Sequence, residues 1–144
     1  MKIIDAFTYY NENDVLKLRL EELYEDVDYF VVVEGTKTFT GNLKPLYFDY
    51  LPAWINKFKD KIIRYKVEDF PPGLSGWGME SHQRNSIYEA LALVPDIHED
   101  DIVFMSDVDE IWNKVILSYD FSCPVKLNMT QYFWNLNWQV PNHC

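Results

Sequence analysis

The sequence is poor in cysteine and contains no long apolar run. Its 144 residues include two cysteines, Cys123 and Cys144, and no CxxC motif or Cys/His cluster. We therefore exclude a disulfide framework and a zinc site, and expect one packed thiol and one terminal thiol. A membrane-spanning helix needs roughly 20 consecutive apolar residues, and the sequence has no such run. Since no signal peptide precedes the first strand-like segment, the sequence predicts a cytoplasmic protein without a membrane segment.

Positive charge is also scarce. Lysine and arginine number 13 against 23 aspartates and glutamates, which gives a formal net charge of −10. An acidic chain repels nucleic acid and anionic membranes on average, so neither is expected as a partner. An anionic ligand would need local help from a metal ion or from a few placed Arg and Lys side chains.

Internal repeats and low-complexity linkers are absent as well. The length suits one domain, and a hydrophobic content of 48% supplies the material for a core. We therefore predict a single domain over residues 1–144.

Short apolar runs alternate with helical patterns along this domain. The apolar runs predict buried strands. They lie at Ile3–Tyr9, Tyr29–Val33, Lys61–Val67 and Asp101–Ser106, and a later run at Val125–Leu136 is expected to be extended. Helices are expected after a cap at Asn13 or Asp14, after Pro52, and over Met79–Val94.

The first helix is expected to bury its apolar side chains and to expose its charged ones. The apolar set is Val15, Leu16, Leu18, Leu20, Leu23 and Tyr24. The charged set is Lys17, Arg19, Glu21 and Glu22. This interpretation places Arg19 on the outside of the domain.

Strands that alternate with helices predict an α/β fold with a mainly parallel sheet flanked by helices. Such sheets are buried on both faces, which explains why the strands lack polar alternation. Ligands in these folds bind beyond the carboxyl ends of the strands. The segments expected there are Tyr9–Glu12, Glu34–Gly41, the loop after Val67, and Ser106–Glu110.

The segment Ser106–Glu110 carries Asp107 and Asp109 directly after the apolar fourth strand. Carboxylates at i and i+2 of a tightening turn can converge on one hard cation, and Mg²⁺ or Mn²⁺ combines one or two carboxylates with water and phosphate oxygens. We therefore predict that Asp107 and Asp109 bind Mn²⁺ or Mg²⁺, which would neutralise charge on the diphosphate of a nucleotide. Glu110 is expected to orient these ligands.

Two other interpretations of this D-x-D motif stay open at the level of the residues. Solvated acidic turns also produce D-x-D tripeptides. An apolar strand followed by D-x-D is also typical of haloacid dehalogenase-type phosphatases, in which the first Asp is a nucleophile. In that class the motif normally follows the first strand, whereas here three strand–helix units precede it.

Further motifs accompany the D-x-D segment in order along most of the chain. They are Phe7–Glu12, Leu18–Leu23, Val32–Gly41, Lys44–Phe48, the pattern Trp77, Glu80 and Arg84, then Asp101–Ile111 and Tyr132–Trp138. With these motifs the chain resembles glycosyltransferase family 17. The resemblance implies a GT-A-type fold, a UDP-sugar donor expected to be UDP-GlcNAc, a divalent metal, and an inverting transfer to a glycan hydroxyl. The family domain continues past the last motif, so we expect this domain to be truncated at its C-terminal end.

Donor-binding side chains are expected at the strand ends and in the loops. They are Glu12, Glu34, Thr38, Lys44, Trp77 and Arg84. The resemblance favours this role for Glu12 and Arg84, and an ordinary capping, packed or solvated role stays open for each of these side chains. Glu80 lies four residues before Arg84, a spacing that an ordinary surface ion pair also explains. A guanidinium held by Glu80 and aimed at the diphosphate suits the planar fork of Arg.

A general base cannot be assigned from the sequence. An inverting transfer needs an acid side chain that takes the proton of the acceptor hydroxyl. Beyond Glu110 the one acid is Asp120, which falls between the motifs. A non-catalytic or truncated nucleotide-sugar-binding module therefore remains the alternative function.

Overall fold

The computed structural model of the chain describes residues 1–129. Backbone contacts divide the chain into two compact units, Met1–Ile111 and a second unit that begins at Trp112. The first unit carries the sheet, and the described part of the second carries a 3-10 helix at Lys114–Ser118. The expectation of one domain over the whole length stays a prediction.

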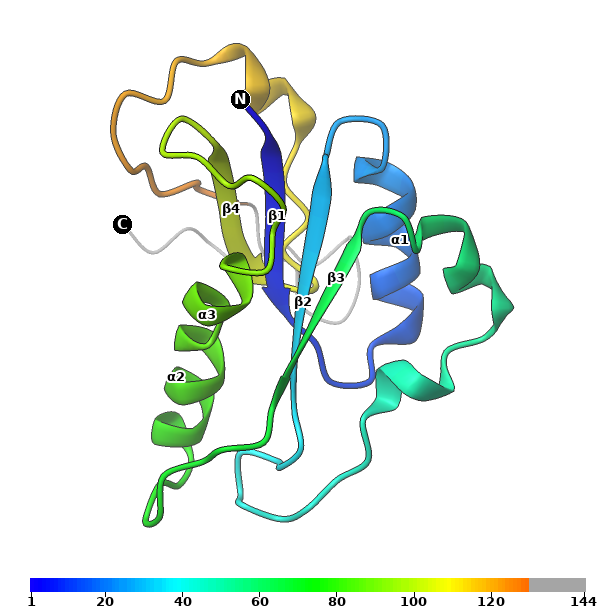
Figure 1. The fold of residues 1–144 in the computed structure, drawn as a ribbon, viewed down its shortest axis with the longest axis vertical. Helices are drawn as coiled ribbons and strands as arrows, with labels where there is room; N and C mark the ends of the chain where they lie inside the picture. The colour runs from blue at the N-terminus through cyan, green and yellow to red at the C-terminus, as the bar shows by residue number, and fades with distance from the viewer. Residues whose placement is uncertain (130–144) are drawn as a thin grey trace. The chain divides into compact units, whose positions relative to one another are not determined.

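A four-stranded parallel sheet forms the centre of the first unit (Figure 1). Its strands are β1 (Ile3–Thr8), β2 (Tyr29–Gly35), β3 (Ile62–Val67) and β4 (Ile102–Asp107). The order is β3-β2-β1-β4, so the chain first builds the sheet to one side of β1 and then returns to its other side. The predicted α/β fold with a parallel sheet is confirmed.

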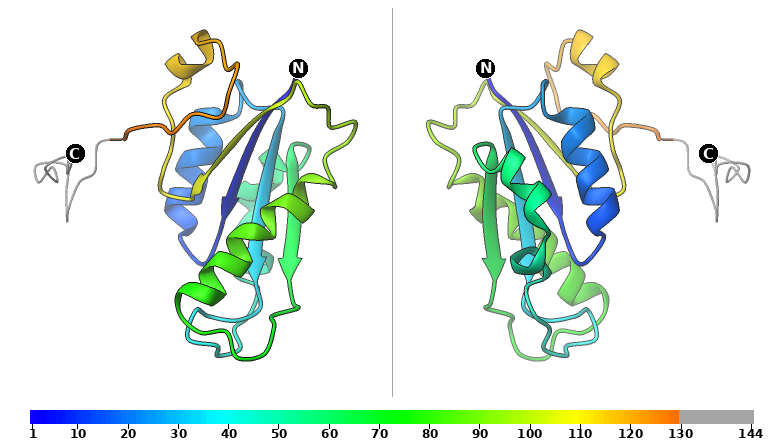
Figure 2. Two further views of the ribbon diagram at one scale, coloured as in Figure 1. Left: turned by 90° about the vertical axis from the view of Figure 1, so that its left-hand side faces the viewer. Right: turned by 90° about the vertical axis from the view of Figure 1, so that its right-hand side faces the viewer.

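Helices cover both faces of this sheet, as the views in Figures 1 and 2 agree. One face carries α1 (Asn13–Leu23), and the opposite face carries α2 (Trp77–Asn85) and α3 (Ile87–Leu91). Two 3-10 helices, η1 (Tyr47–Tyr50) and η2 (Ala53–Phe58), lie between β2 and β3 in the chain. The second of these is the short helix predicted after Pro52.

The predicted start of α1 is wrong by one or two positions. Glu12 occupies the N-cap, and Asn13 is the first helical residue, so neither Asn13 nor Asp14 caps the helix. The Asn13 side chain has another partner, because its Oδ1 accepts a hydrogen bond from the Tyr9 hydroxyl at 2.5 Å.

The predicted helix over Met79–Val94 consists of two shorter helices. The break falls at Ser86, which ends α2 and precedes α3. Its hydroxyl donates to the carbonyl oxygen of His82 at 2.9 Å. A serine that bonds back to the carbonyl one turn earlier competes with the helical ladder and bends the helix. A hydrophobic pattern alone does not reveal such a bend.

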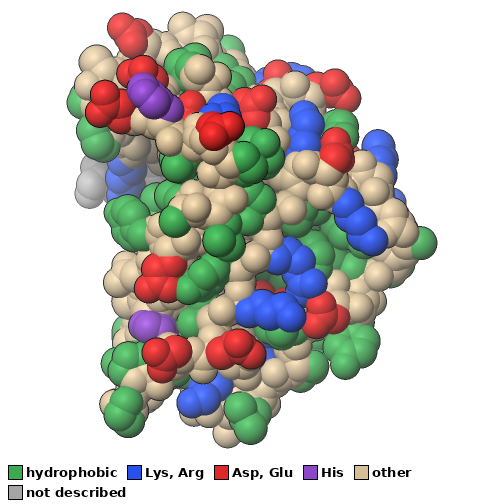
Figure 3. Space-filling model, viewed as in Figure 1, with side chains coloured by type: hydrophobic (Ala, Val, Ile, Leu, Met, Phe, Trp, Pro, Cys, Tyr) green, Lys and Arg blue, Asp and Glu red, His purple; other side chains and the backbone are tan. Residues whose placement is uncertain are grey.

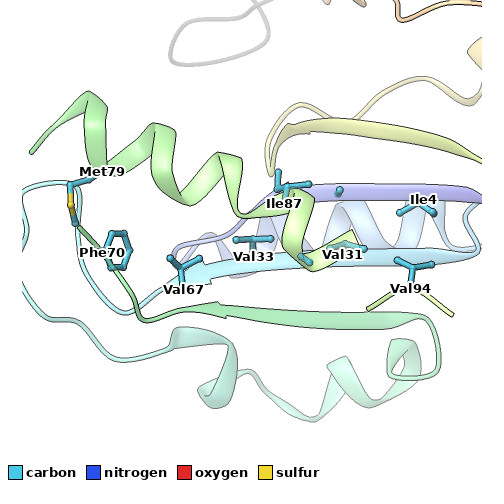
Figure 4. Close-up of a cluster of buried hydrophobic side chains, with 10 residues drawn as sticks. Ile4, Val31, Val33, Val67, Phe70, Met79, Ile87 and Val94 are labelled. Carbon is cyan, nitrogen blue, oxygen red and sulfur yellow. The ribbon is translucent and has the colours of Figure 1, made fainter. Parts of the chain in front are cut away.

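A hydrophobic core lies between the sheet and the helices α2 and α3 (Figure 4). Its buried members are Ile4, Ala6, Val31, Val33, Val67, Phe70, Met79, Ile87, Ala90 and Val94. Alternate side chains of β1 and β2 point into this layer, as strand geometry requires. Burial of this set fixes α2 and α3 against the strands, and α2 extends to the edge where the strands end.

The opposite layer contains a charged residue that the sequence analysis placed outside. Arg19 is fully buried, and its neighbours Leu16 and Leu20 are fully buried with it. The prediction that Arg19 faces solvent is therefore wrong. Leu18, which was assigned to the apolar face, is 52% exposed. Positions 16, 19, 20 and 23 follow the i, i+3, i+4, i+7 spacing of one helix face, so the backbone carries Arg19 inward.

Charged side chains protect one edge of the sheet. β3 is an edge strand, and it carries Arg64 and Lys66. In the space-filling view, Lys and Arg side chains gather on this side of the molecule (Figure 3). Arg64 Nη1 donates to Asp49 Oδ1 at 2.7 Å. Charges on an edge strand discourage pairing with a strand of another chain.

Several expectations concern the C-terminal part of the chain. Cys123 is free and exposed, so the expectation of a packed thiol is wrong, because this cysteine lies in a segment without helix or strand. Residues 125–129 contain no strand, and the rest of the predicted run Val125–Leu136 lies outside the described residues, as do Tyr132–Trp138 and Cys144.

Within residues 1–129, no helix has the length and apolar character that a membrane span requires.

The core between the sheet and α3 can be tested at two adjacent residues. Ile87 is fully buried, whereas Tyr88 is 69% exposed. We expect Ile87→Ala to lower the free energy of unfolding by about 2–5 kcal/mol, because it removes apolar contacts and leaves a cavity. Tyr88→Ala should change it by about 0.5 kcal/mol or less. Urea denaturation of both variants measures the difference, and equal effects would contradict this packing.

Candidate functional site

The carboxyl ends of the strands bring the predicted site segments to one edge of the sheet. Thr8, the last residue of β1, is in register with Val33 of β2 and with Asp107 of β4. Because β2 and β4 flank β1, the chain reverses its building direction beside β1. Such a switch point opens a crevice between neighbouring strand ends, where open α/β sheets bind ligands. The D-x-D motif lies at this position.

The D-x-D motif forms a tight turn directly after β4. The Glu110 N–H donates to the Asp107 carbonyl at 3.0 Å, and the Asp107 N–H donates to Glu110 Oε2 at 3.0 Å. Between them Val108 is buried, whereas Asp109 and Glu110 are exposed. The carboxylate of Glu110 therefore holds the backbone of the turn from outside. The predicted role of Glu110 in orienting metal ligands stays a prediction.

Arg19 holds the same turn from inside. Its Nη1 donates to the carbonyl oxygens of Asp107 at 2.7 Å, Val108 at 3.1 Å and Glu110 at 3.2 Å. Its Nη2 donates to Ser106 Oγ at 2.6 Å. One guanidinium thus bonds to all but one of the residues from 106 to 110. The turn cannot change its path without breaking several of these hydrogen bonds together.

Asp5 balances the charge of Arg19 in the interior. Arg19 Nε and Nη2 donate to the two oxygens of Asp5, each at 2.7 Å, and both side chains are fully buried. The guanidinium also lies 4.5 Å from the centre of the Phe7 ring. A paired, bidentate geometry is the condition under which a buried ion pair is tolerated. Asp5 in β1 therefore fixes Arg19, and Arg19 fixes the D-x-D turn.

Arg84 reaches the D-x-D motif from the opposite side of the sheet. Its Nη2 donates to Asp107 Oδ1 at 2.7 Å and to Glu80 Oε1 at 3.3 Å. The predicted Glu80–Arg84 pair is therefore present, and the guanidinium lies at the motif. The side chains of Arg84 and Asp107 are 48% and 44% exposed. Solvent can thus reach this pair, and a ligand can compete for either partner.

Two of the predicted donor-binding residues hold the loop after β2. Glu34 and Lys44 are buried, and Lys44 Nζ donates to Glu34 Oε1 at 3.1 Å. Glu34 also accepts from the backbone N–H of Tyr47 at 2.6 Å and of Phe48 at 3.3 Å. The ammonium of Lys44 lies 5.1 Å from each of the rings of Tyr10 and Tyr47. These polar groups are already satisfied within the protein, which favours a supporting role for both residues.

The end of β1 has a tyrosine that sequence analysis did not single out. Burial, together with the carboxylates of Glu34 and Glu12, raises the pKa of Tyr9 well above its ordinary range. Its hydroxyl therefore stays protonated and keeps its bond to Asn13. The carboxylate of Glu12 accepts from the N–H groups of Tyr10 and Asn11, each at 3.1 Å, and so holds the turn between β1 and α1.

A pocket of about 270 Å³ lies where β1 and β2 end. Its lining residues are Tyr10, Glu12, Lys37, Thr38, Phe39, Thr40 and Gln83. Glu12 and Thr38 were predicted as donor-binding residues, whereas Gln83 was missed. Gln83 directly precedes Arg84 on α2, so one helix connects this pocket to the D-x-D motif.

The two loops at this edge are joined by a backbone hydrogen bond. The Gly76 N–H, before α2, donates to the Phe39 carbonyl, after β2, at 2.8 Å. Gly76 has a φ of +49°, a conformation that favours glycine. Trp77 follows it as the first residue of α2 and is 81% exposed. This exposure leaves the indole ring accessible to a ligand.

The chemistry of the motif suits a hard divalent cation. Asp107 and Asp109 offer carboxylate oxygens, and Mg²⁺ or Mn²⁺ takes its other ligands from water and phosphate. Among residues 1–129, no three His, Cys, Asp or Glu side chains gather in a way that could hold a metal ion. The carboxylate of Glu110 is directed to the Asp107 N–H instead. Two carboxylates fit a metal that arrives with a phosphorylated ligand better than one held by protein alone.

We compared the chain with protein families, with curated proteins and with solved structures. The sequence signature of glycosyltransferase family 17 matches residues 1–144. The proteins named beta-1,4-mannosyl-glycoprotein 4-beta-N-acetylglucosaminyltransferase from Homo sapiens and Rattus norvegicus are each 26% identical to this chain over 150 residues, and the Mus musculus protein is 25% identical. These alignments cover 97% of this chain and 28% of each relative. The chain therefore spans about 28% of the length of these relatives. No solved structure matches it.

Because the Asp5–Arg19 pair beneath the motif is buried, we expect substitution of Arg19 to lower stability strongly. Arg19→Met should lower the free energy of unfolding by about 3–5 kcal/mol, because it removes the guanidinium partner of buried Asp5. Lys17→Met is the control, since Lys17 lies on the same helix in an exposed pair with Glu21 at 3.9 Å. Lys17→Met should lower the free energy of unfolding by about 1 kcal/mol or less.

Chemical denaturation compares these variants with Asp5→Leu/Arg19→Met. The double variant removes both charges, so it should be more stable than Arg19→Met alone. If Arg19→Met is no more harmful than Lys17→Met, the pair does not have the structural role described above.

Proposed function

The chain belongs to glycosyltransferase family 17, and we propose that it binds the nucleotide-sugar donor of a metal-dependent glycosyl transfer at the carboxyl edge of its sheet. The observation that carries this proposal is the contact between Arg84 and Asp107 at 2.7 Å. It brings a cation-binding carboxylate and a phosphate-binding guanidinium to one place. The adjacent residue Gln83 then extends the site into the pocket at the ends of β1 and β2.

The proposed donor is UDP-GlcNAc, and the proposed acceptor is a glycan hydroxyl. The names of the relatives from Homo sapiens and Rattus norvegicus support this choice, because both describe N-acetylglucosaminyl transfer. A GT-A-type fold and inversion at the sugar carbon belong to the same proposal. The parallel sheet with a D-x-D turn at its switch point supports that assignment.

Each residue near the motif has a distinct part in the proposed binding. Asp107 and Asp109 would hold Mn²⁺ or Mg²⁺, which when bound neutralises charge on the diphosphate. Arg84 donates to a phosphate oxygen in a planar, charge-assisted bond, while Glu80 keeps the guanidinium in place. The exposed ring of Trp77 offers a stacking surface for the sugar.

The loop after β2 forms the other wall of the proposed donor site. Thr38 lines the pocket, and its hydroxyl is within hydrogen-bond distance of the Thr40 hydroxyl at 2.8 Å. Glu34 and Lys44 support this wall from beneath through their buried ion pair. Glu12 closes the pocket at the end of β1. Binding therefore uses a loop whose shape is set before the donor arrives.

Transfer also requires a base that takes the proton of the acceptor hydroxyl. We assign no residue within 1–129 to that role, so the proposal for this chain is donor binding as the first step of transfer. A module that binds the donor without turnover is the alternative. Donor binding without product, over a range of glycan acceptors, would favour that alternative.

Thermal unfolding tests the role of the D-x-D motif. UDP-GlcNAc with Mn²⁺ should raise the melting temperature of the parent protein, since about 100 Kd of ligand adds about 2.7 kcal/mol of stability. Asp109→Ala should abolish the shift, because it removes one of the two metal ligands. Glu99→Ala, which neutralises an exposed acid in the loop before β4, should retain it. An unshifted melting temperature in the parent protein would overturn the proposed function.

Calorimetry tests the role of Arg84 separately. Arg84→Gln should raise the Kd for UDP with Mn²⁺ roughly tenfold to a hundredfold, since charge-assisted hydrogen bonds to phosphate are lost. Binding of Mn²⁺ alone should not weaken, because Asp107 is released from its guanidinium partner. Arg64→Gln is the matched control, since Arg64 also pairs with an aspartate at 2.7 Å. Equal UDP affinity in Arg84→Gln and the parent would rule out this contact.

A further inference from the structure

Gln83 is a buried polar residue without a hydrogen-bond partner for its side chain in the part of the chain that the structure describes. It is 4% exposed and lies on α2, one residue before Arg84. The side chain packs closely over the end of β2, so a Cβ atom at Gly35 would lie 2.8 Å from Gln83 Oε1 and 2.9 Å from the Phe70 ring. Glycine at position 35 therefore makes room for this amide.

The amide of Gln83 opens onto the pocket at the ends of β1 and β2. Its side chain makes no hydrogen bond within residues 1–129, and its polar atoms are not among the fully closed-off groups that lack a partner. The pocket that the side chain lines therefore gives access to the amide. A ligand in that pocket can use both the N–H and the C=O of this group.

The other polar groups around the pocket already have partners within the protein. The Thr38 hydroxyl interacts with Thr40 at 2.8 Å and accepts from the Asn42 N–H at 3.1 Å. Glu12 accepts from two backbone N–H groups. The ammonium of Lys37 lies 5.7 Å from the centre of the Phe70 ring. Gln83 is therefore the buried lining residue with unused donor and acceptor capacity.

The chemistry of a primary amide defines what it can bind. Its N–H and C=O lie side by side in one plane, so two parallel hydrogen bonds require a ligand edge with an adjacent donor and acceptor. The N3–H and a carbonyl of uracil form such an edge. The acetamido group of GlcNAc is a trans secondary amide, whose N–H and C=O point in opposite directions, so it cannot form both bonds with one glutamine. The aromatic side chains of Tyr10 and Phe39 in the lining suit a planar ring.

We propose that Gln83 binds the imide edge of the donor's uracil through paired hydrogen bonds. This inference rests on the proposed function and adds the residue that reads the base. The pocket volume of about 270 Å³ is near the lower limit of small-molecule sites, which span about 300–1,000 Å³. A pocket of this size accepts one ring of the donor, while the diphosphate extends toward Arg84 and the D-x-D turn.

The test compares Gln83→Met with the parent protein by calorimetry in the presence of Mn²⁺. Methionine keeps the length of the side chain and its packing over Gly35, but it removes both hydrogen bonds. The Kd for UDP, UDP-glucose and UDP-GlcNAc should rise roughly tenfold in each case, which corresponds to the loss of two neutral hydrogen bonds. The Kd for inorganic pyrophosphate should not change, because this ligand has no base.

Two controls separate the role of the amide from effects on folding. Asn85→Met places the same side chain at an exposed position of α2 and should bind UDP like the parent. UDP methylated at N3 lacks the imide donor, so methylation should weaken binding to the parent but not to Gln83→Met. If Gln83→Met fails to fold, the parent protein alone tests the proposal, because equal affinities for UDP and for N3-methylated UDP would overturn it.

Each outcome bears on one of the two proposals. An unchanged UDP affinity in Gln83→Met overturns the role of Gln83 while leaving donor binding intact. A loss confined to UDP-GlcNAc, with UDP and UDP-glucose unaffected, would show that Gln83 contacts the acetamido group and would also overturn the proposal. Failure of the parent itself to bind UDP with Mn²⁺ would contradict the proposed function instead.

Discussion

The buried pair between Asp5 and Arg19 is the interaction on which the site depends. Asp5 lies in the central strand, Arg19 lies on α1, and the guanidinium bonds to the backbone of the turn that carries Asp107 and Asp109. Removing a full charge from water is costly, so this arrangement persists only where every donor of the guanidinium has an acceptor. Here the acceptors are the two oxygens of Asp5 together with the Ser106 hydroxyl and three carbonyl oxygens of the D-x-D turn. Stability of the fold and geometry of the site therefore share the same hydrogen bonds.

The rest of the site is arranged around this fixed turn. Arg84 approaches it from α2, and the Glu34–Lys44 pair shapes the loop that lines the pocket. These contacts differ in exposure: the pairs beneath the site are buried, whereas the pair between Arg84 and Asp107 is half exposed. Buried pairs are suited to hold a shape, and an exposed pair is suited to exchange its partner for a ligand. The buried ion pairs thus support the site, whereas the exposed pair between Arg84 and Asp107 is open to a ligand.

Much of the fold could be predicted from the sequence because buried parallel strands are read directly from apolar runs. The four strands and the position of the D-x-D motif at their carboxyl edge follow from this pattern. The break at Ser86 was missed because it leaves the apolar spacing of the predicted helix intact. The sequence analysis placed Arg19 outside because it gave the charge of the side chain more weight than its position on the helix face. Two features of the sequence indicate that Arg19 is buried. It shares one helix face with Leu16 and Leu20, and the predicted first strand contains one acid, Asp5, that can pair with it.

The candidate site was predictable to a different degree at each residue. Arg84 lies close to the motif because α2 packs on β1 and β2, and β4 is the neighbour of β1. The family pattern singled out Arg84 but not its contact with Asp107. The roles of Glu34 and Lys44 could not be read from the sequence, because their pairing depends on how the loop between β2 and η1 returns to the sheet. Gln83 gave no signal either, since a glutamine on a helix is normally solvated. Only its burial over Gly35 distinguishes it.

The contacts of Arg19 also impose an order on the biogenesis of this chain. Its bonds to Asp5 join residues 14 positions apart, whereas its bonds to the turn span 87 to 91 positions. During synthesis from the N-terminus, the ion pair can form early, but the remaining donors of the guanidinium have no acceptors until β4 has left the ribosome. In a nascent chain that ends before the turn, these donors can bond only to water. The residues that precede β4 therefore cannot supply all the acceptors of Arg19, and β4 with its turn completes the set.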